Sequence, residues 1–206
     1  MINRASRNWA LAACVGLLSG CVYSYTEIPA DLVKGVSFIY GAPKSVPASK
    51  IYDQLASRSD AQPLTVAHAS AGAQTYLLGN LRDGVGTYYG PDGQSISLRD
   101  GVIVSTRAVG RDLMSADVDQ SLALIRTGQG GQVQRFHSYR DDHEQIITRS
   151  YVCDITAPAN ARVIETCHSA TGKFTNSYRV AAGRITGSTQ VIDDRGAFTI
   201  GAATGG

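Results

Sequence analysis

The stretch "VGTYYGPDGQSISLRDGVIVSTRAV", residues 85–109, contains short apolar runs separated by two turn signals. The turns "GPDG" and "RDG" each supply a glycine, which adopts the positive φ of tight hairpins because it has no Cβ. In "SISL", Ile96 and Leu98 alternate with serines, so one face of this strand is buried and the other is wet. The stretch therefore predicts antiparallel strands joined by hairpins.

The same pattern continues on both sides of this stretch. "TYLLGNL" and a further "RDG" precede it, and a second series of strand-like runs occupies residues 132–193. No long helices alternate with these runs. The sequence therefore predicts an all-β fold, a curved antiparallel meander sheet that buries one face.

One or two short helices are expected beside the sheet. In "PASKIYDQLASRS", residues 47–59, Ile51 and Leu55 have helical spacing and Ser49 is a candidate N-cap. In "MSADVDQSLALIRTG", residues 114–128, Leu122 and Ile125 have the same spacing, which predicts a loop with one helical turn.

The N-terminus has the features of a secretory signal. Arg4 and Arg7 precede an apolar run, residues 9–19, that is too short for the ~20 residues of a membrane-spanning helix. Leu18-Ser19-Gly20-Cys21 matches the pattern at which lipoprotein signals are cleaved before an acylated cysteine. The rival site at Cys14 would leave an apolar region shorter than the ~7 residues required. An ordinary signal-peptidase site near Gly20 is the alternative.

These features predict the location of the mature protein. Lipidation at Cys21, followed by Val22 rather than aspartate, favours the outer membrane of a Gram-negative bacterium, on its periplasmic side. The predicted parts are a signal peptide (1–20), a lipidated tether with a first strand (21–45), a single β-rich domain (46–200) and a flexible tail (201–206).

Charge excludes nucleic acid as a partner. The chain has 19 basic and 17 acidic residues, and the signal removes two basic ones, so the mature protein is formally neutral. It also lacks the Lys/Arg cluster that a phosphate backbone requires.

Two cysteines remain in the mature chain after Cys21 is acylated, and both are predicted to lie in adjacent strands. Cys153 and Cys167 are equidistant from Asn160 in the turn between those strands, which places them opposite one another. Opposed positions lie ~4.5 to 5.5 Å apart at Cα, within reach of a disulfide. A disulfide is expected outside the cytoplasm, and two buried thiols are the alternative.

Catalytic and metal-binding motifs find little support. "TGQGGQ", residues 127–132, lacks the lysine of a P-loop and predicts a hairpin loop. "DDHEQ", residues 141–145, contains acids that could act in acid–base chemistry or bind a cation, but adjacent residues on a strand face opposite ways, so a solvated turn is expected. The four histidines lack zinc spacing. No catalytic residue, metal or cofactor is predicted.

A set of arginines recurs near the turns of the first meander. They are Arg82, Arg99, Arg107 and Arg111. These side chains are candidates for contact with an acidic polysaccharide or a partner protein, and a solvated face with salt bridges is the alternative.

The stretch "VGTYYGPDGQSISLRDGVIVSTRAVGRDLMSAD", residues 85–117, resembles the YjbF family of outer-membrane lipoproteins, also described as group 4 capsule polysaccharide lipoproteins. Members carry an aromatic strand, a "DG" turn, a Leu-Arg-x-Gly hairpin and a Thr-x-Gly-Leu-Gly-x-Asp-Leu loop, where this chain has Ala108-Val109-Gly110. The likeness includes the helix at 48–55 and "GKFTNSYRV" with "GRITGSTQVI" downstream.

The resemblance implies a half-barrel around a small helical element and a role in capsule or exopolysaccharide production and export. It implies no catalytic residues. The leading interpretation is a scaffold or glycan-binding lipoprotein that works beside export proteins. The alternatives are a carrier of a lipid or glycolipid in the concave face, and a glycan-cleaving enzyme that uses Asp141 or Glu144 with a distant acid.

Overall fold

The computed structural model describes residues 48–68, 71–141, 143, 145–157, 162–193 and 196–202. The chain divides into two units, Met1–Lys44 and Ser45–Gly206, and all described residues belong to the second. The predicted signal peptide, Cys21 and the strand expected within residues 21–45 lie outside the described residues.

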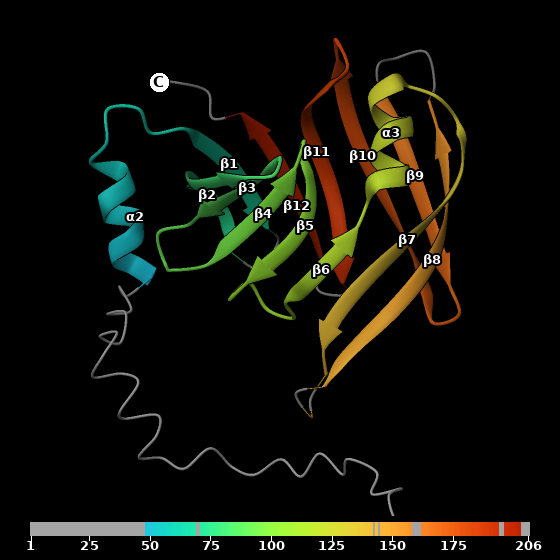
Figure 1. Ribbon diagram of the computed structural model, residues 1–206, viewed down its shortest axis with the longest axis horizontal. Coiled ribbons are helices and arrows are strands. Elements are labelled where there is room, and N and C mark those ends of the chain that lie inside the picture. Colours follow the sequence, from blue (N-terminus) through green and yellow to red (C-terminus); the bar gives the residue numbers. More distant parts are fainter. Residues whose placement is uncertain are drawn as a thin grey trace, which may run out of the picture. The chain divides into compact units, whose positions relative to one another are not determined.

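Twelve antiparallel strands form one sheet, which confirms the predicted all-β class (Figure 1). Their order across the sheet is β5-β4-β3-β2-β1-β12-β11-β10-β9-β8-β7-β6. In chain order the elements are α2 (Ala48–Ala56), β1 (Pro63–His68), β2 (Gly72–Arg82), β3 (Val85–Tyr89), β4 (Ser95–Arg99), β5 (Val102–Arg107), β6 (Leu113–Asp117), α3 (Asp119–Thr127), β7 (Gly131–Arg140), β8 (Ile146–Thr156), β9 (Arg162–Ser169), β10 (Gly172–Ala181), β11 (Arg184–Asp193) and β12 (Gly196–Ala202).

The predicted hairpins lie where the glycine turns placed them. Asp83 and Gly84 connect β2 to β3 with φ of 51° and 76°, and Asp100 and Gly101 connect β4 to β5 with φ of 46° and 89°. Two successive residues with positive φ match the right-handed twist of the flanking strands, as in a type I′ turn. The Asp-Gly pairs therefore determine the register of the first meander.

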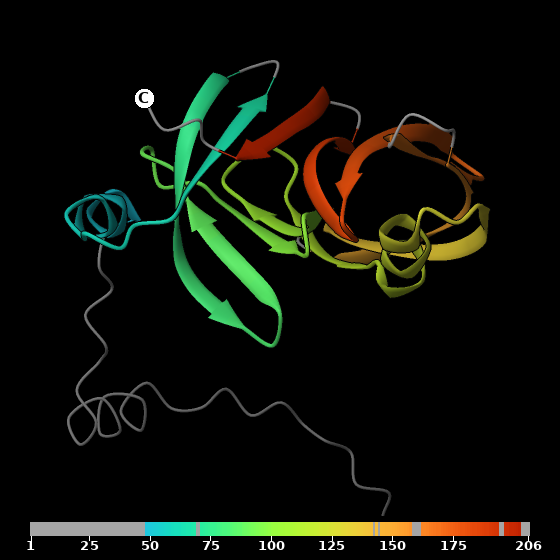
Figure 2. The same cartoon turned by 90° about the horizontal axis from the view of Figure 1, so that it is seen from above.

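The sheet closes further than the predicted half-barrel, into a nearly closed barrel-like sheet (Figure 2). β12 pairs with β1 on one side, where Leu64 faces Ala202, and with β11 on the other. The two edge strands, β5 and β6, meet through side chains: the Leu113 amide donates to Thr106 Oγ1 (3.0 Å), and Arg107 donates to the Leu113 carbonyl.

Strand β12 also changes the expected end of the domain. It continues to Ala202, two residues beyond the predicted boundary, and the rest of the predicted tail lies outside the described residues.

Both predicted helical segments form helices. α2 buries Leu55 against β2, and α3 is a full helix rather than one turn, with Leu122 and Ile125 buried over β7 and β8. α3 ends at Gly128, whose φ is 65°, so "TGQGGQ" joins a helix to β7 and the prediction of a hairpin loop is wrong. Of the helices that the structure describes, none has the length and apolar character needed to span a bilayer.

Two apolar clusters fill the interior. One joins α3 to β7–β10 through residues such as Ile125, Ile155 and Val163, and the other joins β1–β5 to β11 and β12 through residues such as Ile96 and Phe198. The predicted disulfide lies in the first cluster. Cys153 and Cys167 are direct cross-strand partners with Cα atoms 3.9 Å apart, and both are fully buried.

Removal of the disulfide should destabilise the domain without changing its fold. The cysteines are 14 positions apart, and closing a loop of about 15 residues is worth ~3 kcal/mol in the chain-entropy model. We expect the double variant Cys153→Ala, Cys167→Ala to lose roughly that free energy of unfolding in urea, and to become insensitive to reductant. Equal stability of the variant and the oxidised parent would contradict this assignment.

Candidate functional site

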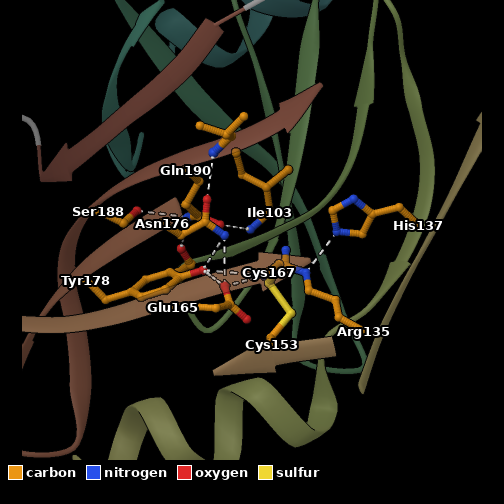
Figure 3. A network of polar contacts seen from close by, with 12 residues as sticks. Ile103, Arg135, His137, Cys153, Glu165, Cys167, Asn176, Tyr178, Ser188 and Gln190 are labelled. Carbon is orange, nitrogen blue, oxygen red and sulfur yellow. Dashed lines mark hydrogen bonds and ion pairs between the residues drawn. A yellow bond between two sulfur atoms is a disulfide. The ribbon is translucent and has the colours of Figure 1, made fainter. Parts of the chain in front are cut away.

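A network of buried polar side chains lies in the interior of the sheet (Figure 3). It comes from alternate, inward-facing positions of β7, β9, β10 and β11, because side chains on a strand face inward with a period of two. Its members are Arg135, His137, Glu165, Asn176, Tyr178, Ser188 and Gln190, each at most 7% exposed.

The centre of the network is an ion pair between β7 and β9. Arg135 Nη1 donates to Glu165 Oε2 at 2.7 Å, and both side chains are fully buried. The same oxygen accepts hydrogen bonds from Asn176 Nδ2 (2.8 Å) and the Tyr178 hydroxyl (2.8 Å). Three donors on one carboxylate oxygen offset the penalty of burying its charge.

A relay of hydrogen bonds runs from the ion pair along β7. Arg135 Nε donates to His137 Nε2 at 2.8 Å, so the proton of the neutral imidazole is on Nδ1. Nδ1 then donates to the Tyr139 hydroxyl (2.8 Å), which donates to the Ile192 carbonyl of β11. The tautomer of His137 thus follows from the fixed charge of Arg135.

Two amide side chains connect β11 to other strands, one of which is distant in the sheet order. Gln190 of β11 reaches across to β5, where it accepts from the Ile103 amide (2.9 Å) and donates to the Gly101 carbonyl (2.8 Å). Asn176 accepts from the Val191 amide at 2.8 Å. These contacts satisfy backbone groups away from the regular ladders, so the network holds the curvature of the sheet.

The pKa values follow the charges in the network. Burial alone would raise the pKa of Glu165, but the charge of Arg135 and the donated hydrogen bonds lower it. The Ser121 hydroxyl of α3 contributes to this lowering, although it makes no hydrogen bond of ordinary geometry with a described group. Burial and the charge of Arg135 hold the pKa of His137 well below its usual range, so His137 is neutral.

Among the described residues, one group has the spacing of metal ligands: Cys153, Cys167 and Glu165, whose ligand atoms lie within 4.8 Å of one another. The two sulfur atoms are bonded to each other, and Glu165 is paired with Arg135. All three side chains are therefore already bonded or paired, and the disulfide lies beside the polar network.

The four arginines singled out in the sequence do not gather at one place. Arg82 and Arg99 lie at the same end of their strands, because both are cross-strand partners of Val85. Arg107 lies at the opposite end of the β4–β5 pair. Arg99 pairs with Asp119 at 2.5 Å, and Arg82 is 84% exposed beside Asp83. The four arginines therefore do not form a single binding face.

Arg111 is the exception, because it borders a pocket. Its guanidinium lies 5.9 Å from the ring centroid of Tyr139, and the guanidinium of Arg149 lies 5.5 Å from the same centroid. Both arginines line a pocket of about 300 Å³ at the end of the sheet. Arg149, an inward-facing residue of β8, is a site residue that the sequence interpretation missed.

The described residues of "DDHEQ", Asp141, His143 and Gln145, lie in a turn between β7 and β8, as predicted. Asp141 Oδ1 accepts hydrogen bonds from the amides of His143 (2.9 Å) and Gln145 (2.8 Å), so this carboxylate shapes the turn. Asp142 and Glu144 lie outside the described residues.

Comparison with known proteins identifies the family of the chain. The family model described as "Group 4 capsule polysaccharide lipoprotein gfcB, YjbF" matches residues 44–198. The chain belongs to this YjbF family. Among solved structures, the fold is similar to that of the hypothetical lipoprotein YmcC from Escherichia coli K12, with a TM-score of 0.57 and 12% identity over 85% of this chain and 95% of that one. No curated protein matches the chain.

Membership of the YjbF family links the domain to a capsule polysaccharide lipoprotein, and the geometry shows how its interior is built. The charged groups of the network bind one another and are shielded from solvent, so their role is to hold β7, β9, β10 and β11 in register. The groups open to a ligand lie at the end of the sheet, around Arg111 and Arg149.

Loss of the Glu165 charge should be strongly destabilising, because it leaves the charge of Arg135 buried without a partner. For Glu165→Gln we expect a loss of about 3 to 5 kcal/mol in the free energy of unfolding, measured in urea. The matched control is Asp154→Asn at an exposed position of β8, whose effect should stay under ~1 kcal/mol. The double variant Arg135→Gln, Glu165→Gln should recover part of the lost free energy of unfolding. An effect of Glu165→Gln no larger than the control would refute the central role of the pair.

Stability should also depend on pH through His137. The pKa of His137 is depressed in the folded state, so the unfolded chain binds a proton that the folded chain does not. The contribution of His137 to the free energy of unfolding is therefore fully present above pH ~6.5. On acidification it falls by up to about 1.4 kcal/mol per pH unit. Between pH 8 and 5, His137→Gln should lose this component of the slope, whereas the exposed control His143→Gln should keep it. The loss of stability that comes from protonation of Glu165 begins at lower pH, below about 4.3. Identical slopes in the two variants would show that His137 titrates normally.

Proposed function

We propose that the protein is a non-catalytic outer-membrane lipoprotein that assists the assembly or export of a capsule or exopolysaccharide, by binding glycan or a partner protein. The observation that carries this proposal is the YjbF family match, which extends over nearly all of the described domain. The signal pattern that ends at Cys21 supports a lipid anchor, and two or more acyl chains at ~0.8 kcal/mol per buried CH₂ would hold the protein stably at a membrane.

The arrangement of charged groups favours binding over catalysis. The buried carboxylate, Glu165, is neutralised by Arg135 and hidden from solvent. Asp141, suggested by the sequence as a catalytic acid, is used to shape a turn. A glycan-cleaving enzyme needs two accessible carboxylates across a cleft, and none of the described residues that line the pocket at Arg111 and Arg149 is Asp or Glu.

The anchor is tested by acylation. Cells that express the full chain and are fed labelled palmitate should label the parent protein and Cys14→Ser, but not Cys21→Ser. Cys14 is the matched control because it lies in the predicted signal. Label retained by Cys21→Ser would contradict lipidation at this residue.

The role in export is tested by deletion. A strain that lacks the protein should release markedly less extracellular polysaccharide than its parent, and Cys21→Ser should fail to restore it, because the domain would no longer be held at the membrane. Unchanged polysaccharide output in the deletion strain, with the export machinery expressed, would refute the proposal.

A second candidate function, carriage of a lipid or glycolipid, is favoured by a separate apolar groove. The groove has a volume of about 440 Å³ and lies between β1–β4 and β11, lined by apolar residues that include Leu64, Leu81, Tyr88, Leu98 and Ile185. Native mass spectrometry of the mature chain with Cys21→Ser distinguishes the two functions. A co-purified lipid would support the carrier, and an empty protein would count against it.

A further inference from the structure

The pocket at the end of the sheet is a basic opening above an aromatic floor. Three cationic side chains line it: Arg111 from the β5–β6 connection, Arg149 from β8 and Lys173 from β10. These three elements are distant in sequence and meet only because the sheet curls. Among the described residues, none of the three cations forms an ion pair or a hydrogen bond.

The floor of the pocket is formed by Tyr139, Tyr151 and Phe174. The rings of Tyr151 and Phe174 meet edge to face with centroids 5.0 Å apart. His137 lies beneath them, 5.6 Å from Phe174 in a stacked arrangement and 5.0 Å from Tyr151. Because the tautomer and position of His137 are fixed by Arg135, the buried network holds this floor rigid.

From this geometry we infer that the pocket is a binding site for a carboxylated sugar unit of an acidic polysaccharide. Unpaired guanidinium groups bind carboxylates through two parallel hydrogen bonds, and the C–H face of a sugar ring packs on aromatic rings. A pocket of about 300 Å³ is at the small end for ligand sites, which suits one or two sugar units better than an acyl chain.

The charge balance of the site itself indicates an anion. The guanidinium groups of Arg111 and Arg149 both lie within 6 Å of the centroid of one tyrosine ring, and none of the described residues that line the pocket is Asp or Glu. Cation–π contact with Tyr139 stabilises each guanidinium but leaves its N–H donors free. A bound carboxylate would supply the negative charge that the described lining of the pocket lacks.

Binding should be measured by calorimetry on the mature chain with Cys21→Ser, which removes the lipid but no described residue. The probe is an oligomer of galacturonic acid, with a neutral malto-oligosaccharide and poly-glutamate of matched charge for comparison. We expect binding of the galacturonate oligomer that weakens with added salt, and none of the neutral sugar. Equal affinity for poly-glutamate would overturn the sugar specificity, and no binding of galacturonate would overturn the site.

Variants locate the binding to the pocket. Arg149→Gln and Lys173→Gln should each weaken binding about tenfold, since a hydrogen bond to a charged group contributes roughly that factor. The matched control is Arg82→Gln at the opposite end of the sheet, which should leave affinity unchanged. Lys173 is exposed, so its replacement disturbs no buried contact and a failure to fold is not expected. Equal losses in all three variants would indicate a diffuse charge effect and refute the site.

This inference names the ligand of the proposed function, but the two can fail separately. If the deletion strain loses polysaccharide output and Arg149→Gln restores it fully, the site is wrong and the function stands. If galacturonate binds at the pocket and deletion leaves output unchanged, the site stands and the proposed role in export is wrong.

Discussion

The ion pair between Arg135 and Glu165 is the constraint on which the interior depends. Two full charges are buried in a domain whose other interior residues are mainly apolar, and this arrangement is stable only if neighbouring polar groups offset the cost of removing the charges from water. Asn176 and Tyr178 fix the carboxylate, while His137 fixes the other side of the guanidinium. The three strands that supply these residues, β7, β9 and β10, must therefore keep one register.

The same network connects the interior to the opening at the end of the sheet. Arg135 orients His137, His137 supports the ring of Phe174 and donates to Tyr139, and Tyr139 carries the guanidinium groups of Arg111 and Arg149. A ligand site built in this way is preorganised, because its floor does not have to be ordered when the ligand arrives. Stability and binding are thus properties of one continuous set of contacts.

Much of the fold follows from local sequence. The Asp-Gly turns identify the first meander, and the symmetry of Cys153 and Cys167 about their turn identifies the disulfide. The pairing of β1 with β12 was not predicted, because it joins the two ends of the domain and no local pattern in "PLTVAH" signals a distant partner. The network was missed for another reason, since charged side chains are normally exposed. The sequence did contain one indication of it. Side chains alternate along β7, so if Val133 and Tyr139 face inward, Arg135 and His137 must face inward as well.

The position of β12 affects the order in which the domain is completed. Of the strands that the structure describes, this one is the last to be synthesised, yet it lies in the middle of the sheet, between β1 and β11. Until it arrives, both of those strands present unpaired edges, which are templates for association with other chains. The pairing of β1 with β12 joins strands that are far apart in the sequence and forms late, and such non-local pairing slows folding. A chain delivered across a membrane from its N-terminus would thus keep two unpaired strand edges, and depend on protection from aggregation, until β12 itself had crossed.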